Sequence, residues 1–219
     1  MSRPYTGAHP PPSAPDATQI AAGQSTPHPS PSAELASLKV RIQSALRQFQ
    51  DFPSKGILFE DIMPIFQDPE LHSALIRSLE LHVLQTFGEE NKPDLILGLE
   101  ARGFLFGPSL ALRLGAGFVA ARKKGKLPGP TVEAAYEKEY GHDYFQMQAD
   151  AVKEGQKVII VDDIIATGGT AAAAGDLVKQ LGGKVLEYIF LMELEFLHGR
   201  DKLEAPVYTL LSGQKESST

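Results

Sequence analysis

The chain of 219 residues contains no cysteine, so disulfide bridges and cysteine-based metal sites are excluded and a reducing compartment is permitted. No stretch reaches the roughly 18 uninterrupted apolar residues of a transmembrane helix, and the apolar run of a signal peptide is also missing. The sequence lacks a Gly-x-Ser-x-Gly motif, and its 6 histidines show no metal-ligand spacing. We therefore expect a cytoplasmic protein without a membrane partner.

Excess positive charge is lacking as well. The formal net charge is −6, which argues against an electrostatic nucleic-acid binder. The hydrophobic content of 42% is ordinary for a globular protein, and the length suits one domain plus a tail.

Residues 1–32 differ from the rest in composition, because half of the 16 prolines lie there among Ser, Thr, Ala and Gly. Such a segment cannot bury enough apolar surface to offset its ordering entropy, so we expect a disordered tail. A transit peptide is the alternative, although repeated arginines and an amphipathic period are absent. The predicted organisation is this tail, a domain over residues 33–212, and a C-terminal tail over residues 213–219.

Within the domain, helical and strand patterns alternate. Helices are predicted from Ala33 to a stop at Asp51, over Pro69–Phe87, over Gly103–Leu114 and over residues 170–181. Strands are predicted over residues 95–97, 117–121, 157–162, 184–192 and 206–211, and the polar stretch 122–148 suggests a mobile hairpin or lid. This alternation predicts an α/β fold, with a mainly parallel twisted sheet flanked by helices.

One stretch, residues 158–170, carries most of the functional signal. A run of β-branched residues ends in Asp162 and Asp163, and the loop Ala166-Thr167-Gly168-Gly169-Thr170 then leads into a helix. Backbone N–H groups at a helix N-terminus bind phosphate, and the carboxylates could hold ribose hydroxyls or the water shell of a cation. The alternative is an ordinary turn with surface aspartates. Two carboxylates at the end of a buried strand are costly unless something binds there.

This stretch resembles the phosphoribosyl-pyrophosphate (PRPP) signature of type I phosphoribosyltransferases. The resemblance implies the type I fold with a small hood and a mobile lid loop. It also implies that residues Ala166 to Thr170 bind the 5′-phosphate. Asp162 and Asp163 would hold the ribose hydroxyls, directly or through water bound to Mg²⁺.

A second motif, Gly98 to Gly107, takes a short apolar strand into a loop with Glu100 and Arg102. The guanidinium of Arg102 could bind a pyrophosphate through two parallel hydrogen bonds. Alternatively, Arg102 only starts a helix and pairs with Glu100. This loop resembles the pyrophosphate loop of the family. The resemblance implies a non-proline cis peptide bond near Glu100–Ala101.

A third motif, Arg122-Lys123-Lys124-Gly125-Lys126-Leu127-Pro128-Gly129, places four cations in five residues. A solvated basic turn is the alternative. Arg122 and Lys126 match family residues that contact pyrophosphate. The run followed by Leu-Pro-Gly resembles adenine phosphoribosyltransferases more than the orotate or hypoxanthine-guanine enzymes.

Two further segments resemble the parts of that family that enclose the base. In the lid, Glu139 matches the acid at the purine nitrogen N7, and Tyr140 would help to seal the site. In the segment Asp51 to Ile62, Phe59 would stack on the purine, and the backbones of Leu58 and Glu60 would contact its edge. Leu194 would pack on the opposite face. Without the resemblance, Phe59 is a core residue and the lid a solvated hairpin. Many relatives carry arginine in place of Glu60, which leaves the role of that side chain open.

The resemblance covers residues 34–211 and implies that adenine and PRPP give AMP and pyrophosphate, with Mg²⁺ as cofactor and a homodimer as the assembly. Two alternatives stay open. Some regulators use this fold to sense PRPP while they bind DNA. They would need a DNA-binding domain and a basic face, whereas the N-terminal extension here is proline-rich. The base could also be hypoxanthine, guanine or xanthine.

Overall fold

A seven-stranded sheet forms the centre of the protein, for which a computed structural model describes residues 29–52, 55, 58–137 and 142–211. Its strand order is β5-β6-β4-β3-β7-β8-β9. The strands are β3 (Leu95–Leu99), β4 (Gly117–Lys123), β5 (Thr131–Glu137), β6 (His142–Gln148), β7 (Lys157–Ile165), β8 (Lys184–Glu193) and β9 (Val207–Thr209). Strands β4, β3, β7, β8 and β9 run parallel, whereas β5 and β6 form an antiparallel hairpin beside β4. The predicted, mainly parallel α/β sheet is confirmed.

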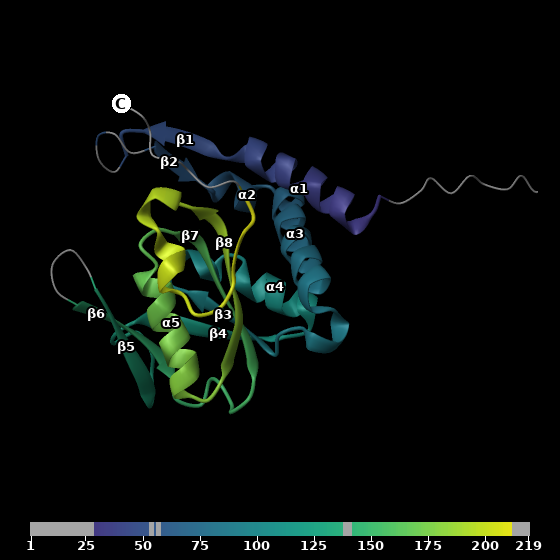
Figure 1. Ribbon diagram of the computed structural model, residues 1–219. Helices are drawn as coiled ribbons and strands as arrows, with labels where there is room; N and C mark the ends of the chain where they lie inside the picture. The colour runs from purple at the N-terminus through teal and green to yellow at the C-terminus, as the bar shows by residue number, and fades with distance from the viewer. Residues whose placement is uncertain (1–28, 53–54, 56–57, 138–141, 212–219) are drawn as a thin grey trace, which may run out of the picture.

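Helices cover both faces of this sheet (Figure 1). They are α1 (Pro31–Ala45), α2 (Met63–Gln67), α3 (Pro69–Phe87), α4 (Gly107–Leu114) and α5 (Gly169–Gln180). In β7, Ile159 and Val161 join the buried cluster with α1, α3 and α4, while Val158 and Ile160 join the cluster with α5. Successive strand residues point to opposite faces, so the continuous apolar run of β7 reflects burial on both sides.

Helix α3 matches its predicted bounds, Pro69–Phe87. The Asp68 carboxylate accepts hydrogen bonds from the backbone N–H groups of Glu70 and Leu71, which satisfies two of the free donors at the helix start. The helix ends at Phe87, and the next residue, Gly88, has a φ of 70°, which favours glycine.

Two helix predictions were wrong in their extent. Helix α1 begins at Pro31 and ends at Ala45, whereas the apolar spacing predicted continuation through Phe49. Phe49 instead lies in β1 (Arg47–Gln50), is 48% exposed, and pairs with Phe59 of the antiparallel strand β2 (Leu58–Asp61). The predicted helix Gly103–Leu114 divides into a 3-10 turn, η2 (Arg102–Phe104), and α4.

Short turns complete the described chain: η1 (Glu89–Asn91), η3 (Glu195–Leu197) and η4 (Gly199–Lys202). The predicted hairpin within residues 122–148 is confirmed by β5 and β6, which pair from Thr131 to Glu137. Among the described residues, no helix combines the length and the apolar character needed to cross a bilayer.

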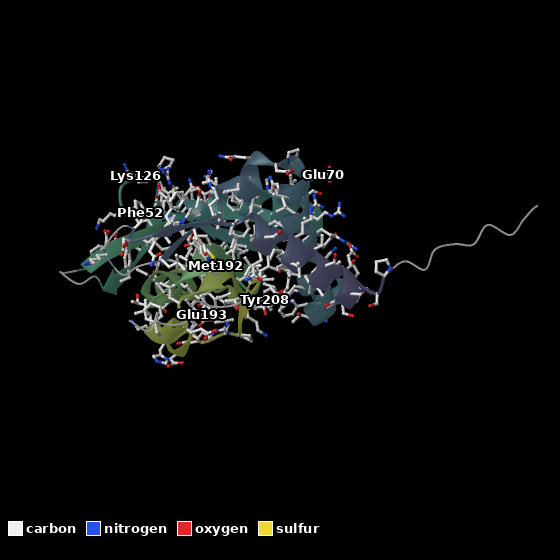
Figure 2. All side chains as sticks on the ribbon, turned by 90° about the horizontal axis from the view of Figure 1, so that it is seen from above. Phe52, Glu70, Lys126, Met192, Glu193 and Tyr208 are labelled. Carbon is white, nitrogen blue, oxygen red and sulfur yellow. The ribbon has the colours of Figure 1, made fainter. Side chains whose placement is uncertain are left out.

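The two-stranded ribbon β1–β2 lies above the carboxyl ends of β7 and β8 (Figure 1). In the view from above, Phe52, just beyond β1, and Lys126, just beyond β4, lie toward the same end of the molecule, while Glu70 at the start of α3 lies toward the other (Figure 2). The ribbon thus extends over the end of the sheet at which ligands bind in open α/β folds.

Candidate active site

A cavity of about 310 Å³ opens at the carboxyl ends of the central strands. Its wall comes from the ends of β3, β4, β7 and β8, from the hairpin β5–β6, and from the loop before α5. The lining residues are Leu99, Glu100, Arg102, Lys123, Tyr136, Phe145, Asp162, Asp163, Ile164, Ile165, Ala166, Thr167, Gly168, Thr170, Ala171 and Phe190. The cavity therefore joins the two strand-end motifs and the start of the basic motif.

The loop from Ala166 to Thr170 forms the entry to α5, which begins at Gly169. Gly168 has a φ of 77°, and a Cβ added there would lie 2.2 Å from the carbonyl oxygen of Gly199. Only glycine meets both the left-handed conformation and this close approach. The backbone N–H groups of the first helical turn have no partner within the helix, so they can donate to an anion in the cavity.

The acidic pair lies at the end of β7. The backbone N–H of Asp163 donates to Oδ1 of Asp162 at 2.9 Å, while the Asp163 carboxylate forms an ion pair with Arg102. Burial, and then the charge of Asp163, raise the pKa of Asp162 well above its ordinary value. Burial also raises the pKa of Asp163, although the Arg102 guanidinium opposes that shift. The strand thus holds two carboxylates in surroundings that disfavour their charge.

This donor set fits a magnesium ion that is shared with a substrate. Within the described part of the chain, no group of three or more His, Cys, Asp or Glu side chains could hold a metal. Asp163 nevertheless has a buried oxygen, Oδ1, without a hydrogen-bond partner, and both aspartates line the cavity. Mg²⁺ uses one or two carboxylates and takes its other oxygen ligands from water and phosphates.

Arg102 and Glu100 do not pair with each other. The alternative for the motif Gly98 to Gly107, in which Arg102 serves only as a partner of Glu100, is therefore wrong. Arg102 pairs with Asp163, and Glu100 accepts hydrogen bonds from Nη2 of Arg122 at 2.7 Å and from the backbone N–H of Lys123 at 3.1 Å. The hydrogen bond from Arg122, the largest cause, lowers the pKa of Glu100. The expected cis peptide bond Glu100–Ala101 is present.

The basic motif contributes Lys123 to the cavity wall, whereas Arg122 and Lys126 are not among the lining residues. Arg122 instead bonds to Glu100 and, through Nη1, to the Lys126 carbonyl at 3.0 Å. Successive side chains of β4 point to opposite faces of the sheet, which explains why Lys123 lines the cavity and the adjacent Arg122 does not. Lys123, Tyr136 and Phe145 are wall residues that sequence reasoning did not select, although Lys123 and Tyr136 lie within the quoted basic and lid motifs.

The predicted base-binding residues lie outside the cavity wall. Phe59 and Phe52 contact edge to face, with ring centroids 5.0 Å apart. The Glu60 carboxylate accepts a hydrogen bond from Nε2 of Gln48 at 3.1 Å, so its side chain serves the pairing of β1 with β2. Leu58 is exposed at the start of β2.

Leu194 is tied to the active-site strand through its backbone, because its N–H donates to the carbonyl of Ile165 at 2.9 Å. Glu139 and Tyr140 lie outside the described residues. Tyr136, near the loop end of the same hairpin, donates a hydrogen bond to its cross-strand neighbour Asp143 at 3.1 Å, and burial is the main cause that raises the pKa of Tyr136 to about 12.

Residues 68–218 match the family of the phosphoribosyl transferase domain. The adenine phosphoribosyltransferase of Yarrowia lipolytica is 64% identical over 83% of this chain and 99% of its own length. The chain belongs to the adenine phosphoribosyltransferase family. The rat enzyme, more distant, is 53% identical over 76% of this chain and 92% of its own length.

Solved adenine phosphoribosyltransferases share the fold. The Saccharomyces cerevisiae enzyme, in complex with adenine and an imino-altritol bisphosphate, has a TM-score of 0.78 at 60% identity, covering 80% of this chain and 99% of its own. The Trypanosoma brucei enzyme, in complex with AMP, pyrophosphate and ribose-5-phosphate, has a TM-score of 0.71 at 25% identity, covering 80% and 79%. The expected type I phosphoribosyltransferase fold is confirmed.

Proposed function

We propose that this protein transfers the 5-phosphoribosyl group of PRPP to adenine and releases AMP and pyrophosphate, a purine salvage reaction. The observation that carries this function is the cavity in which the loop before α5, the acidic pair and Arg102 meet. Similarity to adenine phosphoribosyltransferases over four fifths of the chain supports adenine as the base.

The residues of the cavity suit positioning and charge stabilisation, with no covalent nucleophile. The loop Ala166 to Thr170 binds the 5′-phosphate through backbone N–H groups and threonine hydroxyls. Asp162 and Asp163 hold the ribose hydroxyls, and their negative charge favours a cationic sugar in the transition state. Asp162 and Asp163 would also hold Mg²⁺, which would supply positive charge to offset the charge that develops on the leaving pyrophosphate.

Arg102 supplies positive charge on the pyrophosphate side. Its side chain is half exposed, so it can leave Asp163 for a phosphate oxygen. Arg122 and Lys126 act on the same group in this proposal, with Arg122 held by Glu100.

The base lies between Phe59 and Leu194, and the backbones of Leu58 and Glu60 bind its edge. Glu139 hydrogen-bonds or protonates N7, and Tyr140 closes the lid so that water is excluded from PRPP. These four contacts and the lid roles rest on the family resemblance. A homodimer, a cytoplasmic location and independence from nucleic acid and membranes remain predictions.

A competition assay tests the choice of base. Adenine, hypoxanthine, guanine and xanthine are offered together with PRPP, and AMP is expected as the main nucleotide. Formation of another nucleotide would retain the PRPP site but remove adenine from the proposal. Titration with duplex DNA tests the alternative of a PRPP sensor that binds DNA. We expect that this protein does not bind the duplex.

A further inference from the structure

The loop of residues 166–170, which we call the phosphate loop, packs directly against a second segment of backbone, residues 198–200. A Cβ added at Gly199 would lie 2.2 Å from the carbonyl oxygen of Ala166 and 2.8 Å from the amide nitrogen of Gly168. A Cβ added at Gly168 would in turn lie 2.2 Å from the carbonyl oxygen of Gly199. The two glycines allow the backbones to touch, so a shift of one segment must move the other.

This segment makes a tight reversal. His198 has a φ of 51° and separates η3 from η4, which begins at Gly199. A left-handed conformation is uncommon for a residue other than glycine, and the surrounding structure must hold it. Gly199 is buried although it belongs to a surface turn.

Arg200 fixes the reversal to the sheet. Its Nε lies 2.7 Å from both carboxylate oxygens of Glu193, its Nη1 donates to the Val207 carbonyl at 2.7 Å, and its Nη2 donates to Thr209 at 3.2 Å. Glu193 is buried at the end of β8, opposite Ile165 of β7. One guanidinium thus joins η4 to β8 and β9, immediately behind the phosphate loop. Figure 2 marks Glu193 beside the yellow ribbon of the C-terminal segment.

We infer that Arg200 and Glu193 are positioning residues for binding of the 5′-phosphate. They hold Gly199 against the loop and thereby set the direction of the loop's N–H donors. Neither side chain lines the cavity, so the effect passes through backbone contact. The inference rests on the proposed function, since the ligand is the phosphate of PRPP.

Arg200→Ala is the main test, and ribose 5-phosphate is the probe. We expect the Kd of ribose 5-phosphate, measured by titration calorimetry, to rise by about tenfold, because misdirected N–H donors lose hydrogen bonds to a charged group and about 1.4 kcal/mol of binding free energy corresponds to a tenfold change. The KM for PRPP rises in parallel. Arg200→Lys keeps one ion pair with Glu193 but loses the planar guanidinium that contacts several partners at once. Its affinity for ribose 5-phosphate should therefore lie between those of Arg200→Ala and the wild type.

Arg113→Ala is the matched control. Arg113 also pairs through Nε with a buried glutamate, Glu80 at 3.0 Å, and its exposure of 55% resembles the 41% of Arg200. Glu80 belongs to α3, away from the loop. Arg113→Ala is expected to lower the unfolding temperature less than Arg200→Ala does, because Arg77 also pairs with Glu80 at 2.9 Å, and to leave the ribose 5-phosphate Kd unchanged.

Gly199→Ala provides a test that does not remove a buried charge partner. The φ of Gly199 lies outside the left-handed region, so its own backbone permits alanine. The added Cβ would act mainly through the loop contact, with one further contact to Cγ1 of Ile165 at 3.0 Å. This variant decides the question if Arg200→Ala does not fold. Unchanged ribose 5-phosphate affinity in a folded Arg200→Ala or Gly199→Ala variant would overturn the inference. Failure of the wild type to bind ribose 5-phosphate would instead refute the proposed function.

Discussion

Replacement of Asp162 by asparagine is expected to stabilise the ligand-free protein while it removes activity. Asparagine has nearly the same shape, and its Oδ1 can still accept the hydrogen bond from the Asp163 backbone at 2.9 Å. The substitution therefore removes mainly the charge. Burial and the neighbouring charge of Asp163 disfavour that charge in the folded state, as the raised pKa of Asp162 indicates.

The expected gain in the free energy of unfolding at neutral pH is about 1–3 kcal/mol, the usual cost of an uncompensated buried polar group. The gain depends on pH. A carboxyl whose folded pKa is raised binds its proton more tightly in the folded state, so wild-type stability falls as pH increases from the unfolded value of about 3.9 through the raised folded value. The difference between variant and wild type should therefore be large at pH 8 and shrink toward pH 4.

Urea unfolding at several pH values measures this difference. Asp163→Asn is the control. Because Asp163 pairs with Arg102, this substitution also removes an attractive contact. We therefore expect a smaller gain in the free energy of unfolding than for Asp162→Asn, or a loss. Both variants should lose most AMP formation. An Asp162→Asn protein that is less stable than wild type at pH 8, or whose stability difference does not depend on pH, would refute the reasoning.

Three further predictions concern the substrates. Glu139→Gln should lower kcat more than it raises KM, because its contact strengthens in the transition state; steady-state kinetics equal to wild type would contradict that role. Gly168→Ala should lower the free energy of unfolding by at least the roughly 1–2 kcal/mol of a left-handed alanine, and raise the KM for PRPP, as denaturation and kinetics can measure. Phe59→Ala should raise the KM for adenine by about two- to tenfold, the worth of one aromatic contact, and leave the KM for PRPP unchanged; an equal change in both would remove the stacking role.

The central part of the fold could be predicted because its signals are local. The apolar run of β7 is long, its burial on both faces is visible as a continuous pattern, and its loop residues need no distant partner to be recognised. Helix α3 carries its own start at Asp68 and its own stop at Gly88. Such elements depend little on the rest of the chain.

The missed elements depend on contacts across the chain. Phe49 continues the helical spacing of α1, yet β1 forms because β2, some ten residues on, supplies its hydrogen-bond partners. Lys123 was not singled out for a similar reason, since the face of β4 that borders the cavity is set by the neighbouring strands. The support from Arg200 could not be found either, because Glu193, Val207 and Thr209 meet only in the folded sheet.

The most direct test of the proposed function is formation of labelled AMP from labelled adenine and PRPP, measured with and without Mg²⁺. We predict turnover that requires Mg²⁺, with pyrophosphate released in equal amount. Tight PRPP binding without turnover of adenine or any other purine base would contradict the enzymatic function and favour a PRPP sensor.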